Sequence, residues 1–244
     1  MFSMRRVFSF LIFTAAIFAV TLLDRNPLPD FAHYTQVQQK KSAFFDYMLP
    51  LVIQSNQVVI EDRNELEMLA SKNDDFSFFE RRALNRLADN YFVHREKRND
   101  LEVIEQLLLR VDPVPPSLAL AQAAIESAWG TSRFAVQGNN LFGQWCYKKG
   151  CGLVPLRRNS GSHHEVAKFD RVSESVKSYI RNINTHRAYA DLRVSRARLR
   201  SAENSASGHQ LAENLIEYSE LREKYVDEVQ AVIRINKLTQ YDKR

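Results

Sequence analysis

One acidic residue, Glu126, stands at the end of a run of small and apolar residues that begins at Ser117 and predicts a helix. A carboxyl in apolar surroundings has its charged form disfavoured, so its pKa rises. Such a group stays protonated near neutral pH and can donate a proton to a leaving oxygen, as the acid of a glycoside hydrolase does. The alternative is a solvated Glu at the helix end, or one paired with a Lys or Arg.

The residues around Glu126 distinguish these interpretations. They read Ala-Gln-x-x-x-Glu-Ser-x-Trp-Gly-x-Ser from Ala121, followed by Asn-Asn-Leu-Phe-Gly at 139–143. From about Pro115 to about Leu192 the chain closely resembles the bacterial β-N-acetylglucosaminidase family, glycoside hydrolase family 73, with its mannosyl-glycoprotein endo-β-N-acetylglucosaminidase-like domain. Within that family it is most similar to the Bax-type proteins, which carry a helical segment ahead of the catalytic domain.

This resemblance implies a lysozyme-like fold that hydrolyses the β-1,4-linked amino sugars of peptidoglycan, with Glu126 as the general acid and no cofactor. Two other functions stay open. A muramidase or lytic transglycosylase would cut the other glycosidic bond and can also work from one Glu. A catalytically weak module that binds the cell wall, or serves as a scaffold, is the alternative from another class.

A second carboxylate would act as base or nucleophile, and its distance from the first would decide between inversion and retention. Many relatives carry a Glu in a Thr-x-Glu context in the β-lobe, whereas residues 153–160 of this chain hold no acid. Glu165 is therefore the predicted second acid, with an exposed strand residue as the alternative. If Glu165 is not catalytic, the 2-acetamido oxygen of the substrate would be the nucleophile.

Two tyrosines match aromatic positions of the family. Tyr189, in a His-Arg-Ala-Tyr context, is carried over as a functional residue that orients the acetamido group or a water. The alternative is a core tyrosine with its hydroxyl satisfied. Tyr179, in a Ser-Tyr-Ile context, is a substrate-binding candidate that we expect mainly in the core.

The other candidates for substrate binding surround Glu126 in the sequence. Trp129 and Phe142 would supply an apolar pocket, and Trp129 is compatible with a core position as well. Asn140 would hold the turn and the floor of the cleft through its amide. Gln144 and Trp145 would lie at the cleft edge, where an indole can stack on a sugar face.

Cys146 and Cys151 are the two cysteines of the chain. In an exported protein they predict a local disulfide beside the cleft. A zinc site with the nearby His163 and His164 lacks a convincing ligand spacing, so we expect no metal. Two unbonded thiols are the remaining alternative.

The N-terminus predicts export. Val7 to Leu23 carry no charge and follow Arg5 and Arg6, at the short limit for a membrane span. A retained signal anchor in the inner membrane, with the rest of the chain facing the periplasm, is favoured over a cleaved signal peptide. Either way the catalytic domain would face the cell envelope.

The whole chain predicts a mainly α (α+β) protein. Its 244 residues are 45% hydrophobic with 7 Gly and 7 Pro, which argues against many short strands. The expected parts are an anchor or signal at 1–25, a helical region at 26–112 and a lysozyme-like catalytic domain with a small β-lobe at 113–244. The net charge of +5 suits an anionic wall or membrane. Neither a nucleic-acid-binding motif nor a nucleotide-binding phosphate loop is present.

Several elements have expected boundaries. An amphipathic helix begins near Tyr34, and Pro50 should kink or break it, with a second helix following. Asn99 or Asp100 should cap a helix that ends before Pro113. Ser117 should cap the helix that carries Glu126. In the last helix, about 221–238, Tyr225 should face inward.

Overall fold

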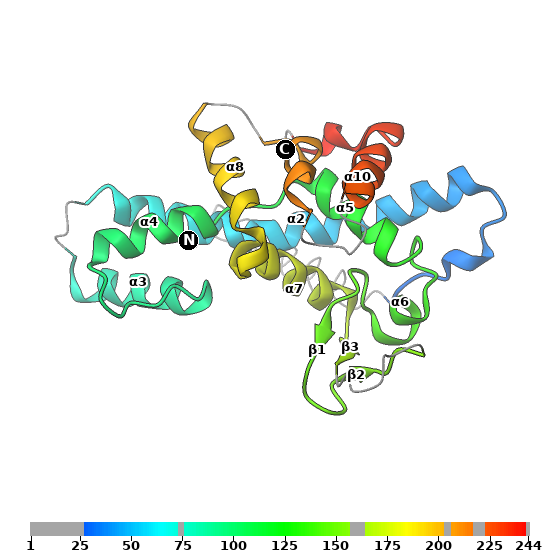
Figure 1. The fold of residues 1–244 in the computed structure, drawn as a ribbon, viewed down its shortest axis with the longest axis horizontal. Helices are drawn as coiled ribbons and strands as arrows, with labels where there is room; N and C mark the ends of the chain where they lie inside the picture. The colour runs from blue at the N-terminus through cyan, green and yellow to red at the C-terminus, as the bar shows by residue number, and fades with distance from the viewer. Residues whose placement is uncertain (1–26, 73–75, 157–163, 203–205, 217–222, 243–244) are drawn as a thin grey trace, which may run out of the picture.

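A computed structural model describes residues 27–72, 76–156, 164–202, 206–216 and 223–242. The predicted anchor, residues 7–23, lies outside these ranges. Within them, no helix is both long and apolar enough to cross a bilayer. The chain is mainly helical with one small sheet, as the sequence predicts (Figure 1).

The longest element is helix α2, Val37–Ala70, which follows the short 3-10 helix η1, Phe31–His33. The prediction that Pro50 breaks this segment into two helices is wrong, because α2 continues through it. A proline inside a helix costs about 3 kcal/mol. Buried apolar side chains on both sides of Pro50, among them Met48, Leu51 and Val52, stabilise the continuous helix.

Two short helices pack against the C-terminal half of α2. They are α3, Phe78–Asn90, and α4, Asp100–Arg110. Ser77 and Asn99 cap them, each with a glutamate three residues later that returns the hydrogen bond. The predicted cap at Asn99 is confirmed.

Helix α5, Pro116–Glu126, is the central buried helix, and nearly every residue from Ser117 to Ala124 is inaccessible to solvent. It packs against α2, α9 (Gly208–Leu211) and α10 (Glu223–Ile235). Its small side chains allow this close approach. Ser117 does not cap the helix as predicted: Pro115 precedes its first turn, and the Ser117 hydroxyl donates to Asp242 at 2.7 Å.

The β-lobe is a three-stranded antiparallel sheet in the order β1-β3-β2. Its strands are β1, Trp145–Cys146, β2, Gly152–Leu153, and β3, Glu165–Ala167. Trp145 pairs with Val166, and Gly152 pairs with Ala167. Helix α6, Arg133–Gly138, connects α5 to this lobe, which lies to one side of the helical body (Figure 1).

The chain returns from the lobe into helix α7, Val172–Thr185, which packs against α2. The turn η2, Arg187–Tyr189, then leads into α8, Ala190–Ser201. The buried guanidinium of Arg193 fixes this turn by donating to the carbonyls of Ile183 and His186 at 3.0 and 2.8 Å.

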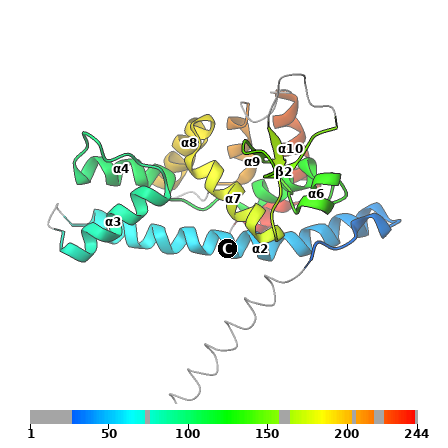
Figure 2. The same cartoon turned by 90° about the horizontal axis from the view of Figure 1, so that it is seen from below.

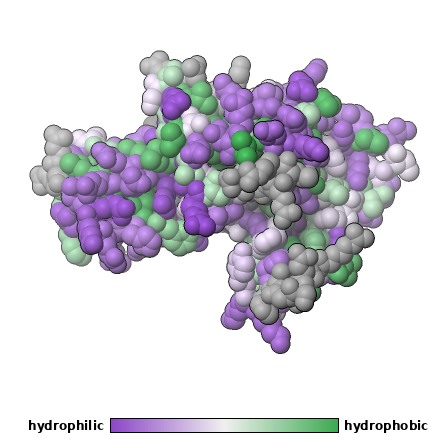
Figure 3. All heavy atoms as spheres, in the orientation of Figure 1, coloured by the Kyte–Doolittle hydropathy of each residue, from purple (hydrophilic) through white to green (hydrophobic). Residues whose placement is uncertain are grey.

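The segment before residue 113 and the segment after it share one hydrophobic core. Figure 2 shows α2 lying along the length of the described molecule, with α4, α7, α8 and α10 on one side of it. The buried Asn56 of α2 exchanges two hydrogen bonds with the backbone of Val114, at 2.7 and 3.0 Å. The N-terminal helices are therefore part of the scaffold that holds α5. Polar side chains dominate the visible surface, and apolar ones form scattered patches (Figure 3).

Candidate active site around Glu126

Glu126 is the last residue of α5, and a tight turn follows it. The Ser127 hydroxyl stabilises this turn, donating to Ala123 O at 2.6 Å and accepting from Gly130 N at 2.8 Å. Ala128, Trp129 and Gly130 all have positive φ angles, 50°, 59° and 77°. A Cβ at Gly130 would lie 2.4 Å from the Phe31 ring, so glycine is required there. The N-terminal segment thus buttresses the turn after Glu126.

The carboxyl of Glu126 is half-buried and makes no ion pair within the described part of the chain. Burial raises its pKa, a hydrogen bond from Tyr225 lowers it, and the negative charge of Glu228 raises it again. Together these effects raise the pKa of Glu126 above its usual value of 4.5. Because an acidic group of raised pKa keeps its proton to higher pH, this carboxyl suits a proton donor.

A chain of hydrogen bonds through the core orients Glu126. The buried hydroxyl of Tyr179 donates to Gln122 Oε1 at 2.6 Å, and Gln122 Nε2 donates to the Tyr225 hydroxyl at 3.0 Å. The Tyr225 hydroxyl in turn donates to the carboxylate of Glu126. Because the Tyr225 hydroxyl oxygen accepts the hydrogen bond from Gln122, its own proton is available to the Glu126 carboxylate.

The Asn-Asn-Leu-Phe-Gly segment borders the carboxyl on another side. Buried Asn140 holds this turn: its Nδ2 donates to the carbonyls of Gln144 and Ala167, both at 2.9 Å, and its Oδ1 accepts from Gln144 N at 3.1 Å. Gly143, at φ 63°, brings its backbone so close that a Cβ there would lie 3.4 Å from Glu126 Oε2.

Phe142 and Tyr179 stack face to face, with ring centroids 4.0 Å apart, and both are buried. Tyr179 therefore lies in the core, and its role at the site is to begin the hydrogen-bond chain. The Phe142 ring is also buried in the core, against the face of Tyr179. Its role in an apolar pocket around Glu126 stays a prediction.

Tyr189 is the tyrosine that reaches the edge of the site. Burial and the nearby charge of Glu126 both raise the pKa of its hydroxyl, and Asn182 donates a hydrogen bond to it. Gln144, Trp145 and Tyr189 line one hollow of about 500 Å³ that opens at this edge. The structure thus brings Glu126, Tyr189, Gln144 and Trp145 to one region of the surface.

Trp129 points elsewhere. Its ring packs edge-on against Phe44 and Phe45 of α2, at centroid distances of 5.8 and 5.3 Å, and Lys41 Nζ lies 5.0 Å from its centroid. These contacts join the turn after Glu126 to the N-terminal helix. The predicted role of Trp129 in substrate binding stays a prediction.

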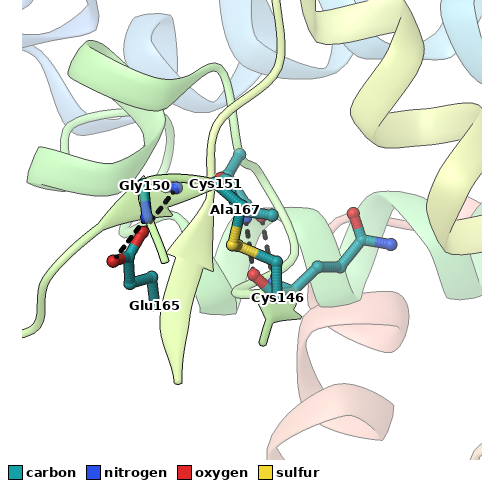
Figure 4. The surroundings of a disulfide bond; sticks show 8 residues. Cys146, Gly150, Cys151, Glu165 and Ala167 are labelled. Atoms are coloured by element: carbon teal, nitrogen blue, oxygen red, sulfur yellow. Dashed lines mark hydrogen bonds between the residues drawn. A yellow bond between two sulfur atoms is a disulfide. The ribbon is translucent and has the colours of Figure 1, made fainter. Parts of the chain in front are cut away.

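Glu165 occupies a different environment, in the β-lobe. Its side chain is buried, and its two oxygens accept from the backbone N–H groups of Gly150 and Gly152 at 3.0 and 2.8 Å. A disulfide joins Cys146 to Cys151 across the same loop (Figure 4). The two sulfurs and a Glu165 oxygen lie close together, but sulfurs bonded to each other do not offer thiolate ligands to a metal.

Two residues of the site escaped the sequence analysis. Tyr225 has the expected inward position, but its contact with Glu126 joins residues almost a hundred positions apart, and no local pattern predicts it. Glu228, one turn further along α10, is exposed and influences Glu126 through its charge. The i, i+4 spacing of Gln122 and Glu126 was the signal that could have identified the buried chain of polar groups.

This arrangement joins a carboxyl of raised pKa, an ordered set of polar groups behind it and an open hollow beside it. Glu126 does not itself line this hollow; Tyr189 links the two, because it lines the hollow and the charge of Glu126 raises its pKa. A carboxyl of raised pKa can protonate the leaving group of a substrate that reaches it.

The chain is similar in sequence to a known protein family and to known proteins. Residues 103–238 match the glucosaminidase family, described as mannosyl-glycoprotein endo-beta-N-acetylglucosaminidase. Protein bax of Escherichia coli (strain K12) is 34% identical over 200 residues, which cover 82% of this chain and 71% of that protein. Exo-glucosaminidase LytG of Bacillus subtilis (strain 168) is 34% identical over 76 residues, 31% of this chain and 23% of that protein. The solved catalytic domain of the autolysin Auto from Listeria monocytogenes has a TM-score of 0.41 at 20% identity, covering 73% of this chain and 96% of that one.

Proposed function

The chain belongs to the glucosaminidase family, and from this premise we propose that it hydrolyses the β-1,4 bonds of peptidoglycan glycan next to N-acetylglucosamine, with Glu126 as the general acid. As a member of this family it is a glycoside hydrolase. The observation that carries the role of Glu126 is its half-buried carboxyl, held by Tyr225 and raised in pKa by burial. We also assign the catalytic region a lysozyme-like architecture, in which the cleft runs between the helical body and the β-lobe.

The catalytic step begins with proton transfer. Glu126 gives its proton to the glycosidic oxygen as the bond from that oxygen to C1 breaks. Loss of the proton leaves Glu126 as a negatively charged carboxylate. The hydrogen bond from Tyr225 stabilises this ionised form. The chain behind Tyr225 keeps this donor in place, so that little reorganisation is needed during the reaction.

The nucleophile in this proposal is the 2-acetamido oxygen of the substrate. It attacks C1 to form a cyclic oxazoline, and a water that loses its proton to the Glu126 carboxylate then opens the ring with net retention. What supports this route over the predicted role of Glu165 is that both oxygens of Glu165 accept backbone hydrogen bonds. In this proposal Tyr189 orients the acetamido group; the support is that its hydroxyl is near enough to Glu126 for that charge to raise its pKa.

The substrate would bind along the hollow next to Tyr189. Trp145 is largely exposed there and can stack on a sugar face. Gln144 Nε2 donates to Ser178 at 3.2 Å, while Gln144 Oε1 has no hydrogen-bond partner among the described residues.

We further infer that residues 7–23 anchor the chain in the inner membrane and that the remainder faces the periplasm. The support is the uncharged run after Arg5 and Arg6, together with the Cys146–Cys151 disulfide, which persists in oxidising compartments. Membrane fractionation followed by protease treatment of spheroplasts tests this: degradation of the catalytic region in spheroplasts is expected. Protection from the protease would place that region in the cytoplasm instead.

The test of the reaction is mass analysis of fragments released from purified peptidoglycan by the purified full-length chain and its Glu126→Gln variant. We expect reducing N-acetylglucosamine ends from the wild type, and release at least about a hundredfold slower from the variant. Anhydro sugar ends would instead identify a lytic transglycosylase. Reducing N-acetylmuramic acid ends would identify a muramidase, and wall binding without release would identify a binding module.

A further inference from the structure

The hollow beside Tyr189 extends beyond the family domain. Its volume of about 500 Å³ lies within the range of small-molecule sites, roughly 300–1,000 Å³. Strand β1 and helix α7 both contribute residues to its lining, and so does Phe92. Phe92 belongs to the connection between α3 and α4, ahead of residues 103–238 that match the family. The N-terminal helical region therefore contributes a residue to the hollow.

Phe92 is held outward by its backbone. Its neighbours Tyr91 and Val93 are each 6% exposed, whereas Phe92 is 51% exposed. Its φ of 55° lies in the left-handed region, which an aromatic residue rarely adopts. Arg110 Nη1 fixes this conformation by donating to the carbonyls of Tyr91 and Phe92, at 2.7 and 2.8 Å.

A cation lies directly over this ring. The guanidinium carbon of Arg181, on α7, is 4.6 Å from the Phe92 centroid. No carboxylate among the described residues forms an ion pair with Arg181, and no Asp or Glu is among the described residues that line the hollow. The ring positions the guanidinium and leaves its N–H groups available to an anion.

Aromatic side chains of the β-lobe also line the hollow. Trp145 and Tyr147 are both largely exposed, and the imidazole of His164 stacks on the Trp145 indole at 4.1 Å. The lining of the hollow thus combines aromatic side chains with the guanidinium of Arg181, which has no ion pair among the described residues. Flat apolar faces suit sugar rings, and a planar guanidinium suits a carboxylate.

We propose that this hollow is a distal subsite for a glycan unit that carries a carboxylate, in which Phe92 stacks on the sugar and Arg181 binds the carboxylate of its lactyl or peptide substituent. The inference rests on the proposed function, since it takes peptidoglycan as the substrate class. It makes the N-terminal helical region a determinant of specificity: an uncharged chitin-type glycan would use Phe92 but not Arg181.

The test measures binding by calorimetry in the full-length Glu126→Gln background, so that hydrolysis does not interfere. The two probes are a peptidoglycan tetrasaccharide with its peptide stems and chitotetraose, which carries no charge. Arg181→Gln should weaken binding of the charged probe about tenfold and change the uncharged one less than about twofold. Phe92→Ala should weaken both probes about tenfold, and Phe92→Trp should retain binding.

Matched controls are Phe78→Ala, at an even more exposed aromatic residue of α3, and Arg82→Gln on the same helix. Neither residue lines the hollow. Variants at Phe92 and Arg181 that bind both probes like these controls would overturn the subsite. If the wild type cleaves no glycan but the charged probe still depends on Arg181, the proposed reaction fails while the subsite stands. If the wild type cleaves the glycan but binding of neither probe depends on Phe92 or Arg181, the proposed reaction stands and the subsite fails.

Discussion

Glu126 and Glu165 are two carboxylates of one small protein in opposite environments. Glu126 ends a helix in the helical body, half-buried, and burial raises its pKa. Glu165 is more deeply buried, yet two backbone N–H groups of the β-lobe surround its carboxylate. Hydrogen bonds of this kind favour the charged form, whereas burial with few donors favours the neutral one.

The difference separates a chemical role from a structural one. A group that gives up a proton during a reaction benefits from a raised pKa, which is the direction that burial gives Glu126. A carboxylate that ties a loop together needs fixed partners, and Glu165 has them in Gly150 and Gly152, beside the Cys146–Cys151 disulfide (Figure 4). The following predictions test this contrast.

The largest effect is expected from Glu165→Gln. The amide presents its NH₂ group to one of the two backbone donors of Gly150 and Gly152, so one hydrogen bond to a charged group is lost. We expect the free energy of unfolding to fall by about 2 kcal/mol and kcat to change by less than about threefold. Urea unfolding and the rate of glycan release measure the two quantities.

The control is Glu174→Gln, which removes a surface carboxylate paired with Arg171 and should cost less than about 1 kcal/mol. The contrast would break if Glu165→Gln unfolded like the wild type but lost activity as fully as Glu126→Gln. Glu165 would then be the second catalytic carboxylate.

A smaller effect is expected from Tyr225→Phe. The variant removes the hydrogen bond that stabilises the Glu126 carboxylate, so the pKa of Glu126 should rise further. The basic limb of the pH–rate profile should therefore move to higher pH, with kcat lowered about tenfold. Tyr34→Phe, at a half-buried ring outside the site, serves as the control. An unchanged pH profile would mean that Tyr225 does not act on Glu126.

The smallest effect is expected in the way the free energy of unfolding of Glu126→Gln depends on pH. The pKa of Glu126 is raised on folding, so the folded state binds this proton more tightly than the unfolded state. The stability that this group contributes is fully present at pH values below its pKa in the unfolded state. It is lost as the pH rises through its pKa in the folded state. The variant should therefore match the wild type near pH 4 and exceed it slightly at pH 7, as thermal unfolding would show. A variant less stable than the wild type at pH 7 would contradict this sign.

Local features were predictable to the extent that local physics decides them. The Asn99 cap depends on residues three positions apart. The small and apolar run before Glu126 does predict a buried helix. Pro50 was misjudged because its intrinsic cost is local, whereas the packing of α2 on α5 and α7 that offsets it joins distant segments. The same reason hid Tyr225, since only folding brings α10 to the end of α5.

By itself, then, the sequence determined the family, the mainly helical class and the position of Glu126, because these rest on residue types at short, fixed spacings. The tertiary structure decided which groups surround that carboxyl and which surround Glu165. It also decided that Phe92, from the connection between α3 and α4, lines the hollow beside Tyr189. The physical reason is that pKa values and binding surfaces depend on burial and on neighbours in space, which come from parts of the chain far apart in sequence.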